Sequence, residues 1–152
     1  MLTELLATIW RRTPVRLRRW ITQLTQTRFA VTVAGIITNP DGRVLLLRHT
    51  FRPGSGWGLP GGFLDAGEQP EAALRRELFE EVGLQLDDVE LFMIRTFKRV
   101  NQIEILFRCT AVGTAKPQSA EISQLDWFSS SNLPEGLPGG QRDLIRKTLS
   151  ED

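Results

Sequence analysis

The sequence has no tyrosine, one cysteine and one histidine among its 152 residues. A single cysteine, Cys109, excludes a disulfide within the chain and suits a reducing cytoplasm. Because Cys109 lies in the apolar run ILFRCTAV, we expect a buried thiol rather than a nucleophile. With His49 as the sole histidine and no second cysteine, the usual ligand sets of zinc are missing.

The chain also lacks a strong net charge and a long apolar run. Its formal charge is +1, so the composition as a whole gives no sign of nucleic-acid binding, and we expect no DNA partner. The apolar runs near the amino terminus are short and interrupted by arginine, which argues against a membrane span. A cleaved signal peptide is not expected either, because the positive charge follows the apolar stretch. The length predicts one domain with a core, and we expect it in the cytoplasm.

Residues 1–28 differ in composition from the rest. They hold six arginines against Glu4, a net charge of +5, which leaves −4 for residues 29–152. Two apolar stripes at helical spacing predict two short amphipathic helices, with Thr13 and Pro14 as a cap and first-turn pair between them. The stripes are Leu2, Leu5, Leu6, Ile9 and Trp10, then Leu17, Trp20, Ile21 and Leu24. Three roles stay open for this extension: packing on the domain or on a homodimer partner, contact with a membrane surface, and contact with polyphosphate or RNA.

Residues 29–152 are predicted to form the main domain. Segments 29–38 and 43–48 are strand-like and flank the turn NPDG, so they predict a hairpin. Segments 89–99 and 102–112 predict a second hairpin, 125–128 a short strand and 141–149 a closing helix. Strands on both sides of one central helix predict an α/β sandwich with a mixed sheet.

The central helix follows a glycine-rich loop, within residues 62–84. Pro70 suits the first turn of this helix, and Gly83 suits a left-handed stop after it. Glu77, Glu80 and Glu81 are spaced to share one helix face, where like charges repel. A hard divalent cation with oxygen ligands offsets that repulsion, and Mg²⁺ or Mn²⁺ is the natural candidate. A solvated acidic face is the alternative interpretation of ELFEE taken alone.

The wider spacing favours the metal interpretation. Seven non-aliphatic positions are fixed, and at ordinary residue usage chance gives them about once in 10⁸ starting points. They are Gly62, Glu68, Arg76, Glu77, Glu80, Glu81 and Gly83. This pattern matches the Nudix box at every defined position, and a weaker likeness extends over residues 29–150. The resemblance implies the Nudix α/β/α sandwich, with residues 1–28 as a helical extension.

The resemblance also implies an activity and a metal site. Nudix enzymes typically hydrolyse a nucleoside diphosphate linked to another group, by attack of water on phosphorus with Mg²⁺ or Mn²⁺. By resemblance, Glu77 and Glu81 are the leading metal ligands, Glu80 is a further ligand or a catalytic group that holds metal-bound water, and the Gly61 carbonyl is another ligand. Arg76 resembles the arginine that pairs with box carboxylates such as Glu68, which is a structural role.

The general base is expected outside the box. Family members often place a carboxylate on a late loop before a tryptophan-containing strand, and Glu121, six residues before Trp127, matches that place best. Glu104 is the weaker candidate, in the middle of a predicted strand. An ordinary surface charge is the alternative for Glu121.

The sequence indicates the residues that contact the substrate less specifically than it indicates the metal ligands. Arg48, Arg52 and Lys98 are candidates for phosphate or sugar contacts, and solvated surface charges are the alternative. Trp57 is a candidate for stacking on a base, with core packing as the alternative. The sequence lacks the tyrosine that is associated with dinucleoside polyphosphate hydrolases of the family. It also has Arg99 at the position where members that act on ADP-ribose usually have a proline.

Three functions are weighed on this basis. The first is a metal-dependent pyrophosphohydrolase acting on a small nucleotide substrate such as a nucleotide sugar, a dinucleotide or a nucleoside triphosphate. The second is a nucleotide-sensing module without turnover, although such modules usually have a degraded box. The third is another Nudix chemistry, such as isoprenoid diphosphate isomerisation or processing of RNA 5′ ends, to which the basic extension lends some support.

Overall fold

The computed structural model describes residues 2–150, except for the side chain of Ser150. Its helices are α1 (Leu2–Arg12), α2 (Val15–Thr25), α3 (Pro70–Val82), the short 3₁₀ turn η1 (Lys98–Val100) and α4 (Gly139–Ser150). Its strands are β1 (Ala30–Thr38), β2 (Val44–His49), β3 (Trp57–Gly58), β4 (Gln85–Phe97), β5 (Gln102–Val112) and β6 (Ile122–Phe128). Within these residues, none of the helices has the length and apolarity that crossing a bilayer requires.

The strands form one mixed sheet in the order β3-β2-β1-β5-β4, with β6 paired to β2. At its centre β1 and β5 are parallel, from Ala30 beside Gln102 to Thr38 beside Thr110. The other pairs are antiparallel, including the predicted hairpin of β4 and β5. The sheet is therefore mixed, as predicted.

The predicted hairpin of residues 29–48 forms, but its two strands pair only beside the turn. The turn forms, with the Asn39 side chain accepting hydrogen bonds from two backbone N–H groups of the turn. However, β1 and β2 pair only at Thr38 and Val44. Farther from the turn, β3 pairs with β2 and the segment after β3 bonds to β1, so this segment separates the two strands. The other edge of β2 pairs along its length with β6. The strand predicted at 125–128 is accordingly longer, since β6 begins at Ile122 to match β2.

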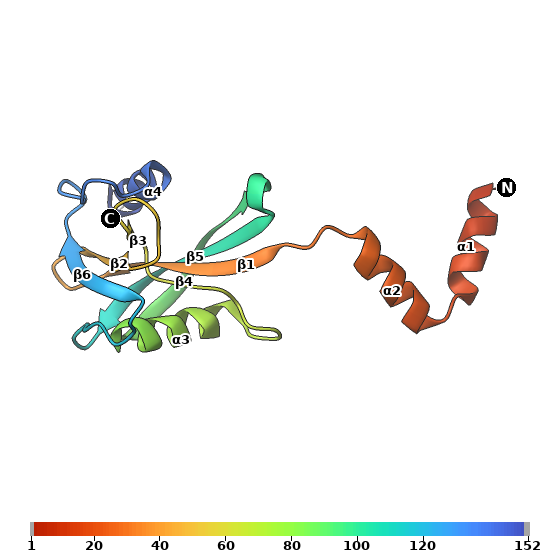
Figure 1. Ribbon diagram of the computed structural model, residues 1–152, viewed down its shortest axis with the longest axis horizontal. Coiled ribbons are helices and arrows are strands. Elements are labelled where there is room, and N and C mark those ends of the chain that lie inside the picture. The colour runs from red at the N-terminus through yellow and green to blue at the C-terminus, as the bar shows by residue number, and fades with distance from the viewer. Residues whose placement is uncertain (1, 151–152) are drawn as a thin grey trace.

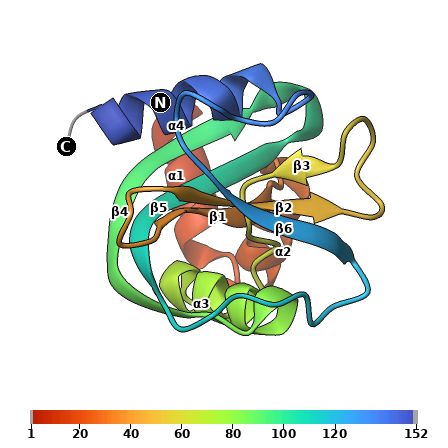
Figure 2. The ribbon, with the colours of Figure 1, turned by 90° about the vertical axis from the view of Figure 1, so that its left-hand side faces the viewer.

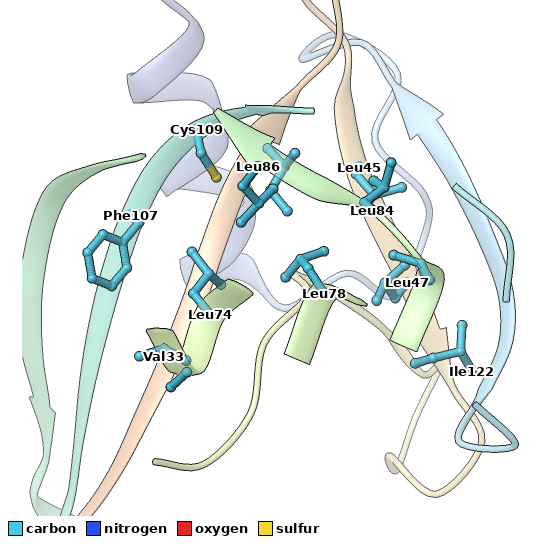
Figure 3. Close-up of a cluster of buried hydrophobic side chains, with 13 residues drawn as sticks. Val33, Leu45, Leu47, Leu74, Leu78, Leu84, Leu86, Phe107, Cys109 and Ile122 are labelled. Atoms are coloured by element: carbon cyan, nitrogen blue, oxygen red, sulfur yellow. The ribbon is translucent and has the colours of Figure 1, made fainter. Parts of the chain in front are cut away.

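Two helices cover the two faces of the sheet, α3 on one side and α4 on the other (Figure 2). The sequence allows this because successive residues of β1 and β2 are apolar on both faces, as buried strands require. Val33 and Leu45 face α3, and their sequence neighbours Ala34 and Val44 face α4. Figure 3 shows the first of these cores, where Leu74 and Leu78 of α3 meet the strands. The α/β/α sandwich is confirmed.

The extension forms the two predicted helices, but these helices do not pack on the sandwich. Figure 1 shows α1 and α2 projecting away from it on the segment that precedes β1, and neither helix contains a buried residue. The predicted cap is also different. Pro14, not Thr13, is the cap residue of α2, and the Thr13 hydroxyl donates instead to the Ile9 carbonyl of α1 at 2.9 Å.

Candidate functional site

The central helix α3 begins and ends where its sequence indicates. Pro70 occupies the first turn, where a missing N–H costs nothing, and Gly83 ends the helix at φ 69° with its N–H donating to the Phe79 carbonyl. The residues buried against the sheet are Ala73, Leu74, Leu78, Glu81 and Val82. Burial of this stripe fixes the rotation of the helix, so its carboxylates face the segment 61–63 and the end of β2.

Arg76 binds carboxylates of this helix face and of the loop that precedes the helix. Its guanidinium makes two bonds of 2.9 Å to the two carboxylate oxygens of Glu68 and a third of 2.9 Å to Glu77. It also donates to the Phe63 carbonyl at 3.1 Å and reaches Glu80 at 3.4 Å. These contacts raise the pKa of Arg76, chiefly through the bonds to Glu68. A planar fork held in this way fixes the direction of the Glu77 side chain.

Glu81 lies deeper, with 7% of its surface exposed. Burial is the main reason that its pKa is raised to about 8, and the nearby charge of Glu77 adds to the effect. The Gly61 backbone N–H donates to its carboxylate, and His49 Nδ1 lies 3.8 Å from Oε1. The second oxygen, Oε2, is buried and has no hydrogen-bond partner among the described residues. A buried carboxylate oxygen without a partner is rare, because it costs free energy unless something binds it.

The segment that contains Gly61 and Gly62 runs beside β1 and faces these carboxylates. Val33 N–H donates to the Gly62 carbonyl at 2.9 Å and Gly35 N–H to the Pro60 carbonyl at 3.0 Å. A Cβ on Gly62 would lie 2.3 Å from the Glu77 carboxylate. A Cβ on Gly61, where φ is 140°, would lie 2.1 Å from the Val33 carbonyl. Gly61 therefore lets this segment lie close to β1, and Gly62 lets its backbone come close to the Glu77 carboxylate.

The loop between β5 and β6 completes the site from the other side. It is tied to the end of α3, because the N–H groups of Lys116 and Gln118 donate to the carbonyls of Val82 and Glu81, each at 2.9 Å. A further bond of 2.7 Å, from Thr50 N–H to the Glu121 carbonyl, ties it to the end of β2. These bonds hold Glu121 close enough for its charge to raise the pKa of Glu81.

These elements enclose a pocket of about 410 Å³. It is lined by His49, Arg52, Gly61, Gly62, Phe63, Asp65, Arg76, Glu77, Glu80, Glu81, Ser119 and Glu121. A second cavity of about 190 Å³ shares Arg52, Gly61, Gly62 and Phe63 with it and extends toward Gln102, Glu104 and Gln141. The two cavities therefore form a continuous concave surface around Arg52.

Arg52 is half-buried between the two cavities. Its guanidinium occupies the space beside Gly58, where a Cβ would lie 1.7 Å from a terminal nitrogen. Burial lowers its pKa, while the carboxylates of Glu81 and Glu104 raise it. Among the described residues no hydrogen bond or ion pair within 4 Å satisfies this guanidinium. A positive group held in this way is suited to an anionic ligand.

The donor set fits a hard divalent cation, although it is not gathered into a cage. In residues 2–150 no group of three or more Asp, Glu, His or Cys side chains is close enough to hold an ion. Glu80 turns outward, with 60% of its side chain exposed, and Glu77 is held by Arg76. The unpartnered Glu81 oxygen, the neighbouring Glu77 carboxylate and the Gly61 carbonyl of the same pocket are oxygen ligands of the kind that Mg²⁺ takes, with few protein groups and several waters.

The structure brings together most of the residues that the sequence suggested. Six of the predicted ligands, catalytic groups and contacts line one pocket with Arg76; they are Gly61, Glu77, Glu80, Glu81, Glu121 and Arg52. Glu68 lies beside the pocket and braces Arg76. Glu104 is held by Arg95 at 2.6 Å and lines the second cavity.

Three predicted substrate contacts lie elsewhere. Arg48 lines an adjoining cavity with His49 and Arg52, and its Nε donates to the Ser55 carbonyl at 3.1 Å. Trp57 packs edge-on against Phe128, with ring centroids 5.2 Å apart, beside the core under α4. Lys98 is exposed in the turn η1 and lines neither of the two cavities around Arg52.

Sequence reasoning gave no catalytic role to His49 and no role to Ser119, and both residues line the pocket. His49 is the last residue of β2, and burial lowers its pKa to about 4, so it is neutral beside Glu81. Its place at the end of an apolar strand was a signal in the sequence, but its contact with Glu81 of α3 depends on how β2 pairs within the sheet. Ser119 lies in the loop tied to α3, for which the sequence gives no periodic signal.

Comparison with known proteins gives a consistent picture. The model of the NUDIX domain matches residues 28–148. A MutT-like protein of Streptomyces ambofaciens is 33% identical over 108 residues, which cover 71% of this chain and 69% of that protein. The NAD-capped RNA hydrolase NudC of Vibrio atlanticus is 30% identical over 73% of this chain, but the match spans only 42% of that relative. The crystal structure of the MutT NUDIX hydrolase from Burkholderia pseudomallei superposes with a TM-score of 0.70 at 27% identity, covering 79% of this chain and 98% of that one.

Proposed function

This chain belongs to the Nudix family of hydrolases, and from that premise we propose that it hydrolyses, with Mg²⁺ or Mn²⁺, a pyrophosphate bond in a nucleoside diphosphate joined to a second group. Nucleotide sugars, dinucleotides and nucleoside triphosphates are the substrate classes. The observation that carries the proposal is Glu81, a buried carboxylate with an unpartnered oxygen beside Glu77 in a pocket that also holds an unsatisfied Arg52. A lone cysteine, buried as a thiol, suits a cytoplasmic location, which we include in the proposal.

Glu77, Glu81 and the Gly61 carbonyl would hold the cation, with Glu80 as a further ligand from the rim. Pro60 and Gly62 use their carbonyls in pairing with β1, and among the described residues no backbone N–H is bonded to the Gly61 carbonyl between them. The bound ion supplies positive charge against the phosphates and makes coordinated water more acidic. Burial supports this assignment, because it disfavours an uncompensated negative charge on Glu81 and so favours a cation there.

The remaining residues position the substrate and handle a proton. Arg52 would donate to a phosphate oxygen of the substrate, and Arg76 keeps the Glu77 carboxylate turned toward the pocket. Glu121 is exposed at the pocket edge on a loop that is bonded to α3, and we propose it as the group that takes a proton from the attacking water. The water oxygen then bonds to phosphorus, the bridging oxygen leaves, and two phosphate-ended products form.

RNA 5′-end hydrolysis is the second candidate. It is supported by the 30% identity to a NAD-capped RNA hydrolase over 73% of this chain and by the net charge of +5 on residues 1–28. The substrate would present the same pyrophosphate to the same carboxylates, so the two candidates differ in the group attached to it. A nucleotide-sensing module without turnover has no separate observation in its favour and is an outcome of the test.

A substrate panel tests the proposal. The purified chain is incubated with Mg²⁺ or Mn²⁺ and with nucleotide sugars, dinucleotides, nucleoside triphosphates and NAD-capped RNA, and release of phosphate-ended products is measured. We expect metal-dependent turnover of at least one small nucleotide. Binding of a nucleotide without turnover across the panel would instead indicate the sensing module, and turnover confined to capped RNA the second candidate.

Glu81→Gln is the first prediction to check on the substrate found. Loss of the buried charge removes the main ligand, so kcat should fall by several orders of magnitude while the far-ultraviolet spectrum stays unchanged. Glu71→Gln is the matched control, because Glu71 lies on the same helix, is exposed and pairs only with Arg75. A Glu81→Gln enzyme as fast as the Glu71→Gln control would remove the metal assignment.

A further inference from the structure

The two amino-terminal helices leave a large apolar surface without a partner. None of their residues is buried, and apolar side chains that normally enter a core stay open to solvent. The most exposed are Leu2, Leu5, Leu6, Ile9, Trp10, Val15, Leu17, Trp20 and Leu24, at 43–74% of their surface. We call residues 2–25 the arm. An unpartnered apolar patch of this kind marks an interaction surface.

Each helix of the arm separates its apolar residues from its charges. At 100° per residue Leu17, Trp20 and Ile21 of α2 gather around Leu24. Arg16 and Arg18 lie on the two flanks of this stripe, and Val15 and Arg19 lie opposite it. In α1 the apolar stripe runs along Leu2, Leu6 and Ile9, and Arg11 falls on the opposite side. Arginines that border an apolar stripe can extend their charged ends away from it while the stripe is covered.

The apolar surface continues onto the domain where the arm joins it. β1 begins at Ala30, which pairs with Gln102, and Gln102 pairs with Phe97 on its other side. The large apolar side chains exposed around this end of the sheet are Phe29, Phe63, Phe97 and Val100, at 37–64% of their surface. The same end of the molecule therefore carries both the basic arm and a ring of exposed apolar residues.

We propose that the arm docks on the surface of an anionic phospholipid bilayer, with α1 and α2 lying in the plane of the interface. Cationic helices with tryptophan and leucine on one face and arginine around the other bind in this way, with the apolar face in the acyl boundary. The arginines then contact lipid phosphates, and Trp10 and Trp20 lie at headgroup depth. The break at Thr13 and Pro14 lets each helix turn its own stripe toward the lipid.

Two other occupants fit the surface less well. RNA would match the arginines but leave nine exposed apolar side chains uncovered. A second copy could cover the stripes with the stripes of its own arm, but this pairing would bring together two segments 1–28 that each carry a net charge of +5.

Binding of the whole chain to vesicles tests the proposal without any measurement of turnover, so it can fail independently of the proposed hydrolysis. Co-sedimentation is measured with vesicles of phosphatidylcholine alone and with equal parts of phosphatidylcholine and phosphatidylglycerol. We expect strong binding only to the anionic vesicles, a blue shift of tryptophan fluorescence, and loss of binding as the salt concentration rises.

Substitutions separate the apolar contribution from the charge. The double variant Ile9→Ser, Leu24→Ser should lose at least tenfold in vesicle affinity, because both residues lie in the stripes. The matched control is Ala7→Ser, Val15→Ser, which changes the opposite faces of the same helices and should bind as the parent does. Changing Arg12, Arg16 and Arg18 together to glutamine should weaken binding on the order of a hundredfold, and changing them to lysine should preserve it.

Three results would overturn the proposal. Equal affinity for neutral and anionic vesicles, or none for either, would exclude charge-assisted docking. A concentration-dependent dimer in light scattering, abolished by Ile9→Ser with Leu24→Ser, would assign the stripes to a second copy. Salt-sensitive binding of an RNA oligonucleotide that is unaffected by the serine substitutions, together with no binding to vesicles, would assign the arm to RNA.

Discussion

At the scale of single residues, Glu81 differs from the other carboxylates of its helix by its surroundings rather than by its chemistry. Glu71 and Glu80 lie on the same helix with more than half of their side chains exposed. Glu81 is 7% exposed, receives one backbone N–H, and faces a neutral histidine. It therefore binds a proton in the absence of a metal and releases it when a cation takes the proton's place.

This environment predicts a pH dependence of stability for the metal-free protein. The folded pKa of Glu81, about 8, lies above its ordinary value of 4.5, so its contribution to stability is complete below pH 4.5 and is lost as pH rises through 8. His49 acts in the opposite sense at lower pH, because its pKa is lowered from 6.5 to about 4 and stability is gained up to pH 6.5. The clearest window is therefore pH 6.5 to 8.5.

Urea unfolding in a chelator measures the effect. The free energy of unfolding should fall across this window in the parent and stay flatter in Glu81→Gln, which has no charge to acquire. Addition of Mg²⁺ should stabilise the parent more at the alkaline end, where the carboxylate is ionised. Parallel curves for the parent and Glu81→Gln would show that Glu81 does not titrate in this range.

Gly62 gives a second prediction at this scale. A methyl group there would meet the end of the Glu77 side chain at 2.3 Å, and that side chain can move away at little cost to the fold. Gly62→Ala should therefore lower the affinity for Mn²⁺, measured by titration calorimetry, and lower kcat by roughly 10- to 100-fold. Gly139→Ala is the control, since nothing lies within 4 Å of its added carbon. Equal metal affinity in the two variants would show that Glu77 is not a ligand.

At the scale of elements, the sequence predicts the features that are determined by residues close together in the chain. The bounds of α3 follow from Pro70, Gly83 and the apolar spacing between them, all of which are local. The role of the loop after β5 does not follow from the sequence, because it depends on two bonds from residues 116 and 118 to the end of α3. Glu121 was found through family resemblance, and its place at the pocket rests on those bonds.

The same limit explains why the hairpin pairs only beside its turn. The turn at Asn39 is local and follows from the sequence, but the remaining partners of β2 are β3 and β6, and β6 lies more than seventy residues later. The position of His49 beside Glu81 depends on that pairing, so the histidine could not be assigned from the sequence.

Alanine substitutions at two glycines test the junction between α3 and the loop after β5. Gly83 and Gly113 both have positive φ, 69° and 99°, so alanine at either should cost on the order of 1–2 kcal/mol of unfolding free energy. Only at Gly83 does the added carbon meet another side chain, Gln118, at 2.2 Å. Gly83→Ala should therefore also lower kcat by shifting the loop that carries Glu121, and Gly113→Ala should not. Unchanged kcat in both would show that the loop does not position a catalytic group.

At the scale of the whole molecule, the chain divides into a sandwich that buries its apolar residues and an arm that does not. Both were visible in the sequence, because binary patterning predicts layers and helices well. The pattern alone does not show whether the apolar stripes of the arm pack on the sandwich. In the structure α3 and α4 already cover both faces of the sheet, and the arm lies apart from them (Figure 1).

This division predicts that the arm contributes little to the stability of the sandwich. Ile9→Ser with Leu24→Ser should leave the urea midpoint of the full chain unchanged, because neither side chain is buried. Leu74→Ala, which empties a fully buried site between α3 and the sheet, should cost about 2–5 kcal/mol. A lower midpoint for the arm variant at every protein concentration would mean that the stripes pack on their own domain in solution. A midpoint that falls only as the chain is diluted would place them against a second copy.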